Sequence, residues 1–221
     1  MSDSLSVPAI KICGLTDIEQ ALAIAAMDVQ AIGAIGVAKS ARFVDSARRR
    51  SLFKALQEKT PNLKRVWVVA DPSDGDLREA LIGDGTPSSI QLHGAESPSR
   101  CAALQQRWPD VEWWKALRPR RAEDLEIMKL YSGTVDALLL DAWSPNQLGG
   151  TGHRLPLDWI SRRTQFTPWW LAGGINAEWI PKLLREVSPD GLDASSMLEV
   201  KPGLKDLGKV QDLVDAVQSL G

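Results

Sequence analysis

Residues 65–94 read RVWVVADPSDGDLREALIGDGTPSSIQLHG and contain the repeating unit of this chain. The apolar, β-branched run at 65–70 predicts a strand, and the amphipathic stretch 73–82 predicts a helix. A second short run at 89–93 predicts another strand. Because a helix-length connection joins the two strands, we expect them to lie parallel, with the helix packed against the sheet.

The same order of strand and helix extends in both directions from this segment. Further strands are predicted at 9–13, 31–37, 111–117, 135–141, 168–173 and 190–195. Further helices are predicted at 17–27, 97–107, 122–131, 177–186 and 207–220. Thr16, Asp71 and Ser97 are predicted to cap helices, because their side-chain oxygens can accept hydrogen bonds from first-turn amides.

Eight parallel strands joined by helices close naturally into an α/β fold of the (β/α)8, or TIM barrel, type, with each strand followed by a helix. The alternative is an open doubly wound sheet, which more often has five or six strands. The apolar runs RVWVVA and VDALLLD suit strands that are covered on both faces, and the count of eight favours the barrel. No linker or change in composition divides residues 1–221, so we expect a single domain.

The composition limits the classes of partner. A formal net charge of −2 provides no broad positive field, so neither nucleic acid nor an anionic membrane is expected as a partner. The first residues show neither the basic start nor the apolar run of a signal peptide, which predicts a cytoplasmic protein. The two cysteines, Cys13 and Cys101, are not spaced with histidine as in a zinc site, so no metal is expected. Cys101 is interpreted as a small buried hydrophobe.

Polar residues gather at the ends of predicted strands. In a (β/α)8 barrel the reacting groups come from the carboxyl ends of the strands and the loops that follow. Each such residue taken alone can equally be a cap or a structural group, but their shared location favours a functional interpretation. These residues are Cys13, Gln91, His93, Asp141 and Asp193.

Glycine-rich and serine-rich loops predict a phosphate site. Glycines let backbone amides approach an anion closely, and the loops after the seventh and eighth strands are the usual phosphate site of such barrels. The predicted phosphate-binding residues are Gly149, Gly150, Thr151, Gly152, Gly173, Gly174, Ser195 and Ser196.

Arg42, just beyond the second strand, could clamp a carboxylate through two parallel hydrogen bonds; the alternative is a solvated surface arginine.

Several motifs together identify a family. KICGLT, KSARFV, QLHG, LLLD with GGTG, LAGGI, GLDASS and PGLKD occur in order between Lys11 and Asp206, and they resemble phosphoribosylanthranilate isomerases. The resemblance implies an Amadori rearrangement of N-(5-phosphoribosyl)anthranilate to 1-(2-carboxyphenylamino)-1-deoxyribulose 5-phosphate in tryptophan biosynthesis. It implies a small phosphosugar substrate and no cofactor. A monomer is favoured, with a homodimer as the alternative.

The resemblance also assigns roles. It implies that Cys13 is the general base, that Asp141 is the general acid and that Arg42 holds the anthranilate carboxylate. Gln91 and His93 match a supporting polar pair in the mouth of the barrel. Lys11 lies two residues before Cys13, so both point to the same side of the strand, and Lys11 is a candidate to stabilise the thiolate.

The chain departs from the family pattern at a few positions. Ala41 replaces a proline beside Arg42, Met197 and Leu198 replace a glycine and a valine after the serines, and Ala177 replaces a proline after Asn176. Two alternatives follow. A histidine-pathway isomerase would have aspartate at the end of the first strand, where this chain has Cys13. A non-catalytic phosphosugar-binding barrel is disfavoured because Cys13, Asp141 and Arg42 are all present.

Overall fold

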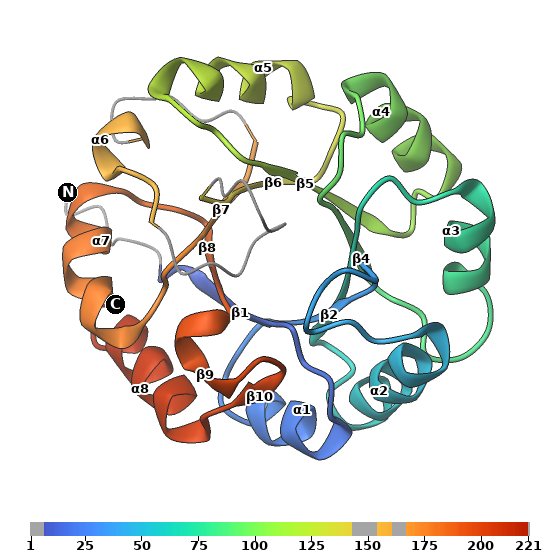
Figure 1. Cartoon of the computed structure of the whole chain (residues 1–221), viewed down its shortest axis with the longest axis horizontal. Helices are drawn as coiled ribbons and strands as arrows, with labels where there is room; N and C mark the ends of the chain where they lie inside the picture. Colours follow the sequence, from blue (N-terminus) through green and yellow to red (C-terminus); the bar gives the residue numbers. More distant parts are fainter. Residues whose placement is uncertain (1–6, 143–153, 161–166, 221) are drawn as a thin grey trace.

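The computed structural model describes residues 7–142, 154–160 and 167–220. Eight parallel strands form a closed barrel in which each strand pairs with the next along the chain and the last pairs with the first. Figure 1 shows the strands as an inner ring and the helices as an outer ring. The strands are β1 (Ala9–Cys13), β2 (Ala31–Ile35), β3 (Lys64–Val69), β4 (Ser89–Leu92), β5 (Glu112–Leu117), β6 (Ala137–Leu140), β7 (Trp169–Ala172) and β8 (Gly191–Ala194).

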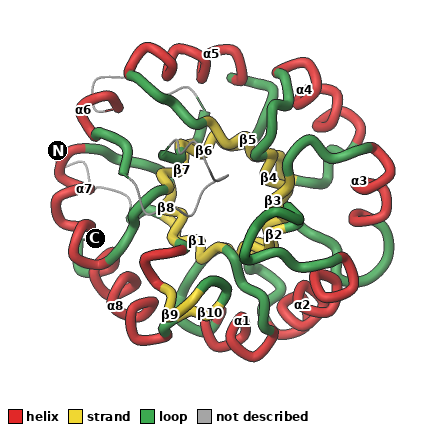
Figure 2. The backbone as a smooth tube through the Cα atoms, in the orientation of Figure 1, coloured by secondary structure: helices red, strands yellow, loops and turns green. Residues whose placement is uncertain are grey.

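The helices are drawn in red in Figure 2, and they include both α-helices and short 3₁₀ helices. The α-helices are α1 (Ile18–Ala25), α2 (Ser46–Lys59), α3 (Asp74–Leu81), α4 (Pro98–Arg107), α5 (Met128–Tyr131), α6 (Leu157–Ile160), α7 (Ile180–Glu186) and α8 (Leu207–Gln218). The 3₁₀ helices are η1 (Ala122–Ile127), η2 (Ala177–Trp179) and η3 (Ser196–Leu198). A small hairpin of β9 (Glu199–Lys201) and β10 (Leu204–Lys205) stands between η3 and α8. The predicted (β/α)8 barrel is therefore confirmed.

Two of the three predicted helix caps are wrong. Ser97 caps α4 as expected, but Asp17 caps α1 and Ser73 caps α3. The Thr16 hydroxyl instead donates to the carbonyl of Gly203 at 3.0 Å. Asp71 has a positive φ of 50°, and its carboxylate accepts a hydrogen bond from the amide of Ala95 at 2.8 Å. Both side chains are used for contacts between loops, which local sequence does not reveal.

Alternation along the strands separates two cores. Trp113 and Trp169 pack in the outer core between the strands and the helices, which also contains Cys101. Trp114 and Trp170 belong to the inner core, where their rings stack with centroids 4.7 Å apart. The interior of the barrel is thus filled with side chains, and the chemistry is confined to its carboxyl end.

Among the described residues, no helix has both the length and the apolar character needed to cross a bilayer.

Candidate active site

The carboxyl end of β1 brings two functional side chains into the barrel. Lys11 and Cys13 are both buried and are separated by one residue, so they share a face of the strand. Gly33 on β2 provides the space: a Cβ there would lie 2.7 Å from Cys13 Sγ and 3.1 Å from Lys11 Cε. The expectation that Lys11 lies on the same side as Cys13 is confirmed.

Lys11 is the centre of a buried polar network. Its ammonium donates to Gln91 Oε1 at 2.7 Å and to Asp193 Oδ2 at 2.8 Å. Burial acts to lower the pKa of Lys11, but the attraction of Asp193 and Cys13 outweighs it and leaves that pKa above its ordinary value. Lys11 therefore stays charged and ties the ends of β1, β4 and β8 together.

The thiol of Cys13 is subject to opposing influences. Burial raises its pKa, Lys11 lowers it, Asp193 raises it and Lys205 lowers it, with a net rise. Lys11 acts in the direction expected of a residue that favours the thiolate. In the unliganded site, however, the neutral thiol is the favoured form of Cys13.

Asp141 has the electrostatics of a proton donor. It follows β6 directly, and its amide donates to the carbonyl of Leu117 at 3.0 Å. Burial, followed by repulsion from Asp193, raises the pKa of Asp141 to about 7. A carboxyl group with such a pKa is protonated in about half of the molecules at neutral pH, which suits a general acid.

Gln91 and His93 lie together inside the mouth of the barrel. The Gln91 amide nitrogen is 3.4 Å from His93 Nδ1, and His93 Nε2 is 3.6 Å from Asp141 Oδ2. Burial and then the charges of Arg118, Lys11 and Lys115 lower the pKa of His93 to about 3, so the imidazole is neutral. Within the described residues, His93 Nε2 and Asp193 Oδ1 are buried without a hydrogen-bond partner.

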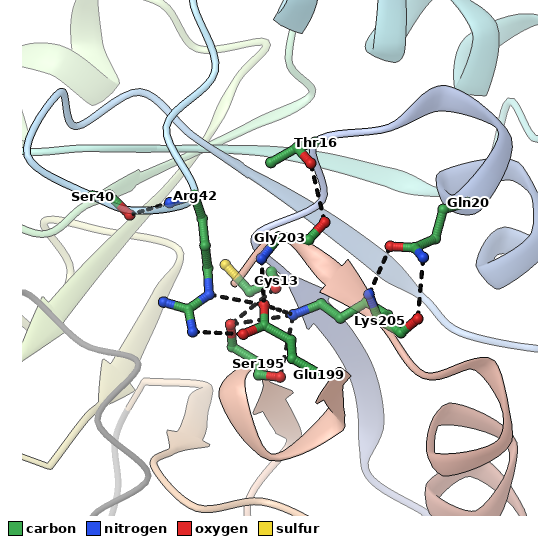
Figure 3. Close-up of polar contacts among 9 residues, drawn as sticks. All are labelled: Cys13, Thr16, Gln20, Ser40, Arg42, Ser195, Glu199, Gly203 and Lys205. Atoms are coloured by element: carbon green, nitrogen blue, oxygen red, sulfur yellow. Dashed lines mark hydrogen bonds and ion pairs between the residues drawn. The ribbon is translucent and has the colours of Figure 1, made fainter. Parts of the chain in front are cut away.

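Arg42 is a buried residue and not the solvated surface arginine of the alternative interpretation. Its side chain crosses the backbone of Gly14, where a Cβ would lie 2.5 Å from Arg42 Cδ. Arg42 Nε and Nη2 donate to the two carboxylate oxygens of Glu199 at 2.8 and 2.6 Å (Figure 3). One edge of the guanidinium is therefore occupied, and no hydrogen bond to the described part of the chain uses the edge formed by Nη1 and Nη2, which can bind another acceptor.

The predicted phosphate loops are described only in part. Gly149, Gly150, Thr151 and Gly152 lie outside the described residues. Gly173 and Gly174 follow β7 with φ of 95° and 66°, a conformation that favours glycine. Ser195 and Ser196 stand where β8 runs into η3, and β8 is the parallel neighbour of β7. The two loops thus adjoin at the carboxyl end of the barrel.

The hydroxyl of Ser195 is already engaged. It donates to the carbonyl of Cys13 at 3.0 Å, so the Ser195 side chain supports the β1 end. The departure from the family pattern at Met197 places a side chain that is 38% exposed on η3.

Sequence reasoning missed several charged residues of this site. Glu199 and Lys205 lie in the β9–β10 hairpin, and of the two only Lys205 falls within a motif that indicates the family, PGLKD. Arg118 directly follows β5 and contributes to the electrostatics of both His93 and Asp141. The one available signal was the position of Arg118 at a strand end, the same criterion that had selected Asp141.

The described residues contain no group of three or more His, Cys, Asp or Glu side chains arranged to hold a metal ion.

Comparisons with known proteins agree on one family. The family profile described as N-(5'phosphoribosyl)anthranilate (PRA) isomerase matches residues 10–216. The N-(5'-phosphoribosyl)anthranilate isomerase of Thermosynechococcus vestitus is 41% identical over 208 residues, which cover 93% of this chain and 88% of the relative. That of Synechococcus elongatus is 42% identical over 208 residues, covering 94% and 95%.

Two solved structures support the same assignment. The phosphoribosyl anthranilate isomerase of Thermotoga maritima superposes with a TM-score of 0.85 at 26% identity, covering 96% of this chain and 99% of that one. The enzyme from Thermus thermophilus gives a TM-score of 0.80 at 28% identity, covering 96% and 100%. The chain therefore belongs to the phosphoribosylanthranilate isomerase family, whose members act in tryptophan biosynthesis.

Proposed function

We propose that Asp141 is the general acid and Cys13 the general base in an Amadori rearrangement of N-(5-phosphoribosyl)anthranilate. The observation that carries this assignment is the pKa of about 7 at Asp141, in the same barrel mouth as Cys13. The reaction needs one proton donated to the furanose ring oxygen and one removed from C2′, and these two groups supply one function each.

Ring opening is the first step. Asp141 donates its proton to the ring oxygen, the C1′–O bond breaks, and the nitrogen lone pair forms a C1′=N iminium. Cys13 then removes the C2′ proton, and the electron pair of that C–H bond forms the C1′=C2′ double bond while the iminium is neutralised. The resulting enolamine tautomerises to the ketone. The electron sink is the substrate's own nitrogen, so no step requires a cofactor.

The productive form of the site has protonated Asp141 together with Cys13 thiolate. Since the pKa of Cys13 is raised above its ordinary value, the more abundant form between the two pKa values has ionised Asp141 and a neutral thiol. Both forms hold the same number of protons, so the productive form is a constant minor fraction between the two pKa values. The iminium that follows ring opening favours proton transfer to the thiolate, because the acidity of C2′–H rises next to a cation.

Substrate anions would be held at two places. The free edge of Arg42 is suited to the anthranilate carboxylate, and the loops with Gly173, Gly174 and Ser196, together with the GGTG segment 149–152, are suited to the phosphate. Gln91 and His93 would line the mouth of the barrel between these two places.

We further propose that residues 1–221 act as one domain, as a monomer, and in the cytoplasm.

The assignment is tested by the loss of fluorescence of freshly prepared N-(5-phosphoribosyl)anthranilate. Purified wild-type protein is expected to accelerate that loss with a chelator present. Cys13→Ala and Asp141→Asn are each expected to lower turnover by about a hundredfold or more while circular dichroism remains unchanged. A folded variant that turns over at the wild-type rate would remove its residue from the mechanism.

A further inference from the structure

Three charged side chains form a buried cluster beside Cys13. Glu199 accepts two hydrogen bonds from Arg42 and one from Lys205 Nζ, the last at 2.8 Å (Figure 3). Lys205 is 3% exposed, which is unusual for a lysine unless its charge has a function or a close partner. We call Arg42, Glu199 and Lys205 the charge triad.

The ammonium of Lys205 is fully used. It donates to Glu199 Oε1 and also lies 3.2 Å from the carbonyl oxygen and 3.4 Å from the hydroxyl of Ser195, so three acceptors surround its three N–H groups. This geometry is that of a charged lysine. Burial lowers the pKa of Lys205, and the carboxylate of Glu199 acts against that effect.

The backbone around Lys205 is fixed as well. Its amide donates to Gln20 Oε1 at 2.9 Å, and Gln20 Nε2 donates to its carbonyl at 3.1 Å. Gln20 lies on α1, so the hairpin is attached to the element that follows Cys13. Lys205 therefore cannot turn its ammonium towards a ligand without losing its contacts with Glu199 and Ser195, and any effect on substrate is transmitted through its neighbours.

The charges of the triad indicate how Lys205 acts on substrate binding through Arg42 and Glu199. Arg42 and Glu199 alone would neutralise each other, and their pair would attract a second carboxylate only weakly. With Lys205 present, two cations face one carboxylate, and one positive charge is left over. The unused edge of Arg42 is where that charge is available for hydrogen bonding.

We propose that Lys205 is a positioning residue for recognition of the substrate carboxylate: it neutralises Glu199, so that Arg42 is held in place yet keeps its charge for the anthranilate group. This inference rests on the proposed function, in which Arg42 binds that carboxylate. Glu199 fixes the direction of the guanidinium, and Lys205 restores the charge that Glu199 would otherwise remove.

The test compares two ligands that differ by one carboxylate. They are the reduced product analogue 1-(2-carboxyphenylamino)-1-deoxyribitol 5-phosphate and its counterpart 1-phenylamino-1-deoxyribitol 5-phosphate. Calorimetry gives a dissociation constant for each, and their ratio is the carboxylate preference. Lys205→Met is expected to reduce that preference by about tenfold, through weaker binding of the carboxylate ligand alone.

A double variant separates charge from structure. Glu199→Gln with Lys205→Met removes both charges and leaves Arg42 with one positive charge, as in the wild type. We expect its carboxylate preference to return to within about threefold of the wild-type value. If Lys205 were only structural, the two substitutions would weaken both ligands together and the double variant would not recover.

Two further variants serve as a second test of the Lys205 charge and as a control. Lys205→Gln removes the charge but keeps a donor, and it repeats the test if the methionine variant does not fold. Lys115→Met breaks another buried ion pair, with Glu96 at 2.7 Å, and should leave the preference unchanged. An unchanged preference in both Lys205 variants would overturn the inference. Failure of the wild type to isomerise its substrate would instead contradict the proposed function.

Discussion

Lys11 Nζ lies 2.8 Å from Asp193 Oδ2, in a buried ion pair whose charges act on both groups assigned to proton transfer. The two partners act in opposite directions on both groups. Lys11 lowers and Asp193 raises the pKa of Cys13, and the same holds for Asp141. One buried ion pair thus couples the acid and the base, and their pKa values are expected to move together when it is altered.

The first prediction concerns the dependence of kcat/KM on pH. The pKa of Asp141 is about 7 and that of Cys13 is above its ordinary value. Below pH about 7 the site gains a proton and kcat/KM falls about tenfold per pH unit, because the thiolate becomes rarer while Asp141 is already protonated. Between the two pKa values kcat/KM is flat, and above the pKa of Cys13 it falls again, because Asp141 no longer carries a proton. Stopped-flow fluorescence across pH 5 to 9 would measure the acidic limb and the plateau, and a kcat/KM that kept rising between pH 8 and 9 would contradict the assignment.

The second prediction is a shift of the acidic limb in Asp193→Asn. Asp193 raises the pKa of Asp141 by repulsion, so its neutralisation lowers that pKa. The pH at which kcat/KM begins to fall on the acid side should therefore move downward. Asp136→Asn is the matched control, since Asp136 lies just before β6, at the opposite end of that strand from Asp141, and accepts a hydrogen bond from the amide of Trp113. A limb that stays in place, or that shifts equally in the control, would contradict the role given to Asp193.

The fold could be predicted because it depends on local patterns. Each strand is a short apolar run that one helix separates from the next, and parallel pairing follows from that order. Cys13, Gln91, His93 and Asp141 could be selected because strand ends converge at one end of a barrel. Thr16 and Asp71 were misassigned because their partners, Gly203 and Ala95, are distant in the chain.

The charge triad could not be predicted for a related reason. Glu199 lies 157 positions after Arg42, in a hairpin of two very short strands that no periodicity reveals. A free arginine clamp was therefore the natural interpretation of KSARFV. In the structure, Arg42 instead uses one edge of its guanidinium to bind Glu199.

That residues 1–221 form a single domain stays a prediction.

The third prediction concerns Arg42→Ala. Loss of the guanidinium removes the proposed partner of the substrate carboxylate and leaves Glu199 with its ion pair to Lys205 and its hydrogen bond from the Gly203 amide. We expect KM to rise by about tenfold or more with a smaller change in kcat, because the interaction is made with the substrate and the transition state alike. Arg42→Lys keeps the charge but cannot bind two carboxylates through separate edges, so it should recover only part of the loss. Steady-state kinetics would measure both constants, and an unchanged KM in Arg42→Ala would show that another group binds the carboxylate.

The last prediction tests the packed floor below the site. Gly191 on β8 faces the indole of Trp170, and a Cβ there would lie 2.3 Å from Trp170 Cε3. Trp170 is itself stacked on Trp114, so it has little freedom to retreat. Gly191→Ala is therefore expected to lower the free energy of unfolding by about 1–3 kcal/mol through overpacking. Gly75→Ala is the matched control, because a Cβ there meets only Ser73 Oγ, at 3.5 Å, and the change within α3 should be neutral or stabilising. Urea denaturation of the two variants measures the difference, and equal stabilities would mean that the tryptophan pair adjusts without cost.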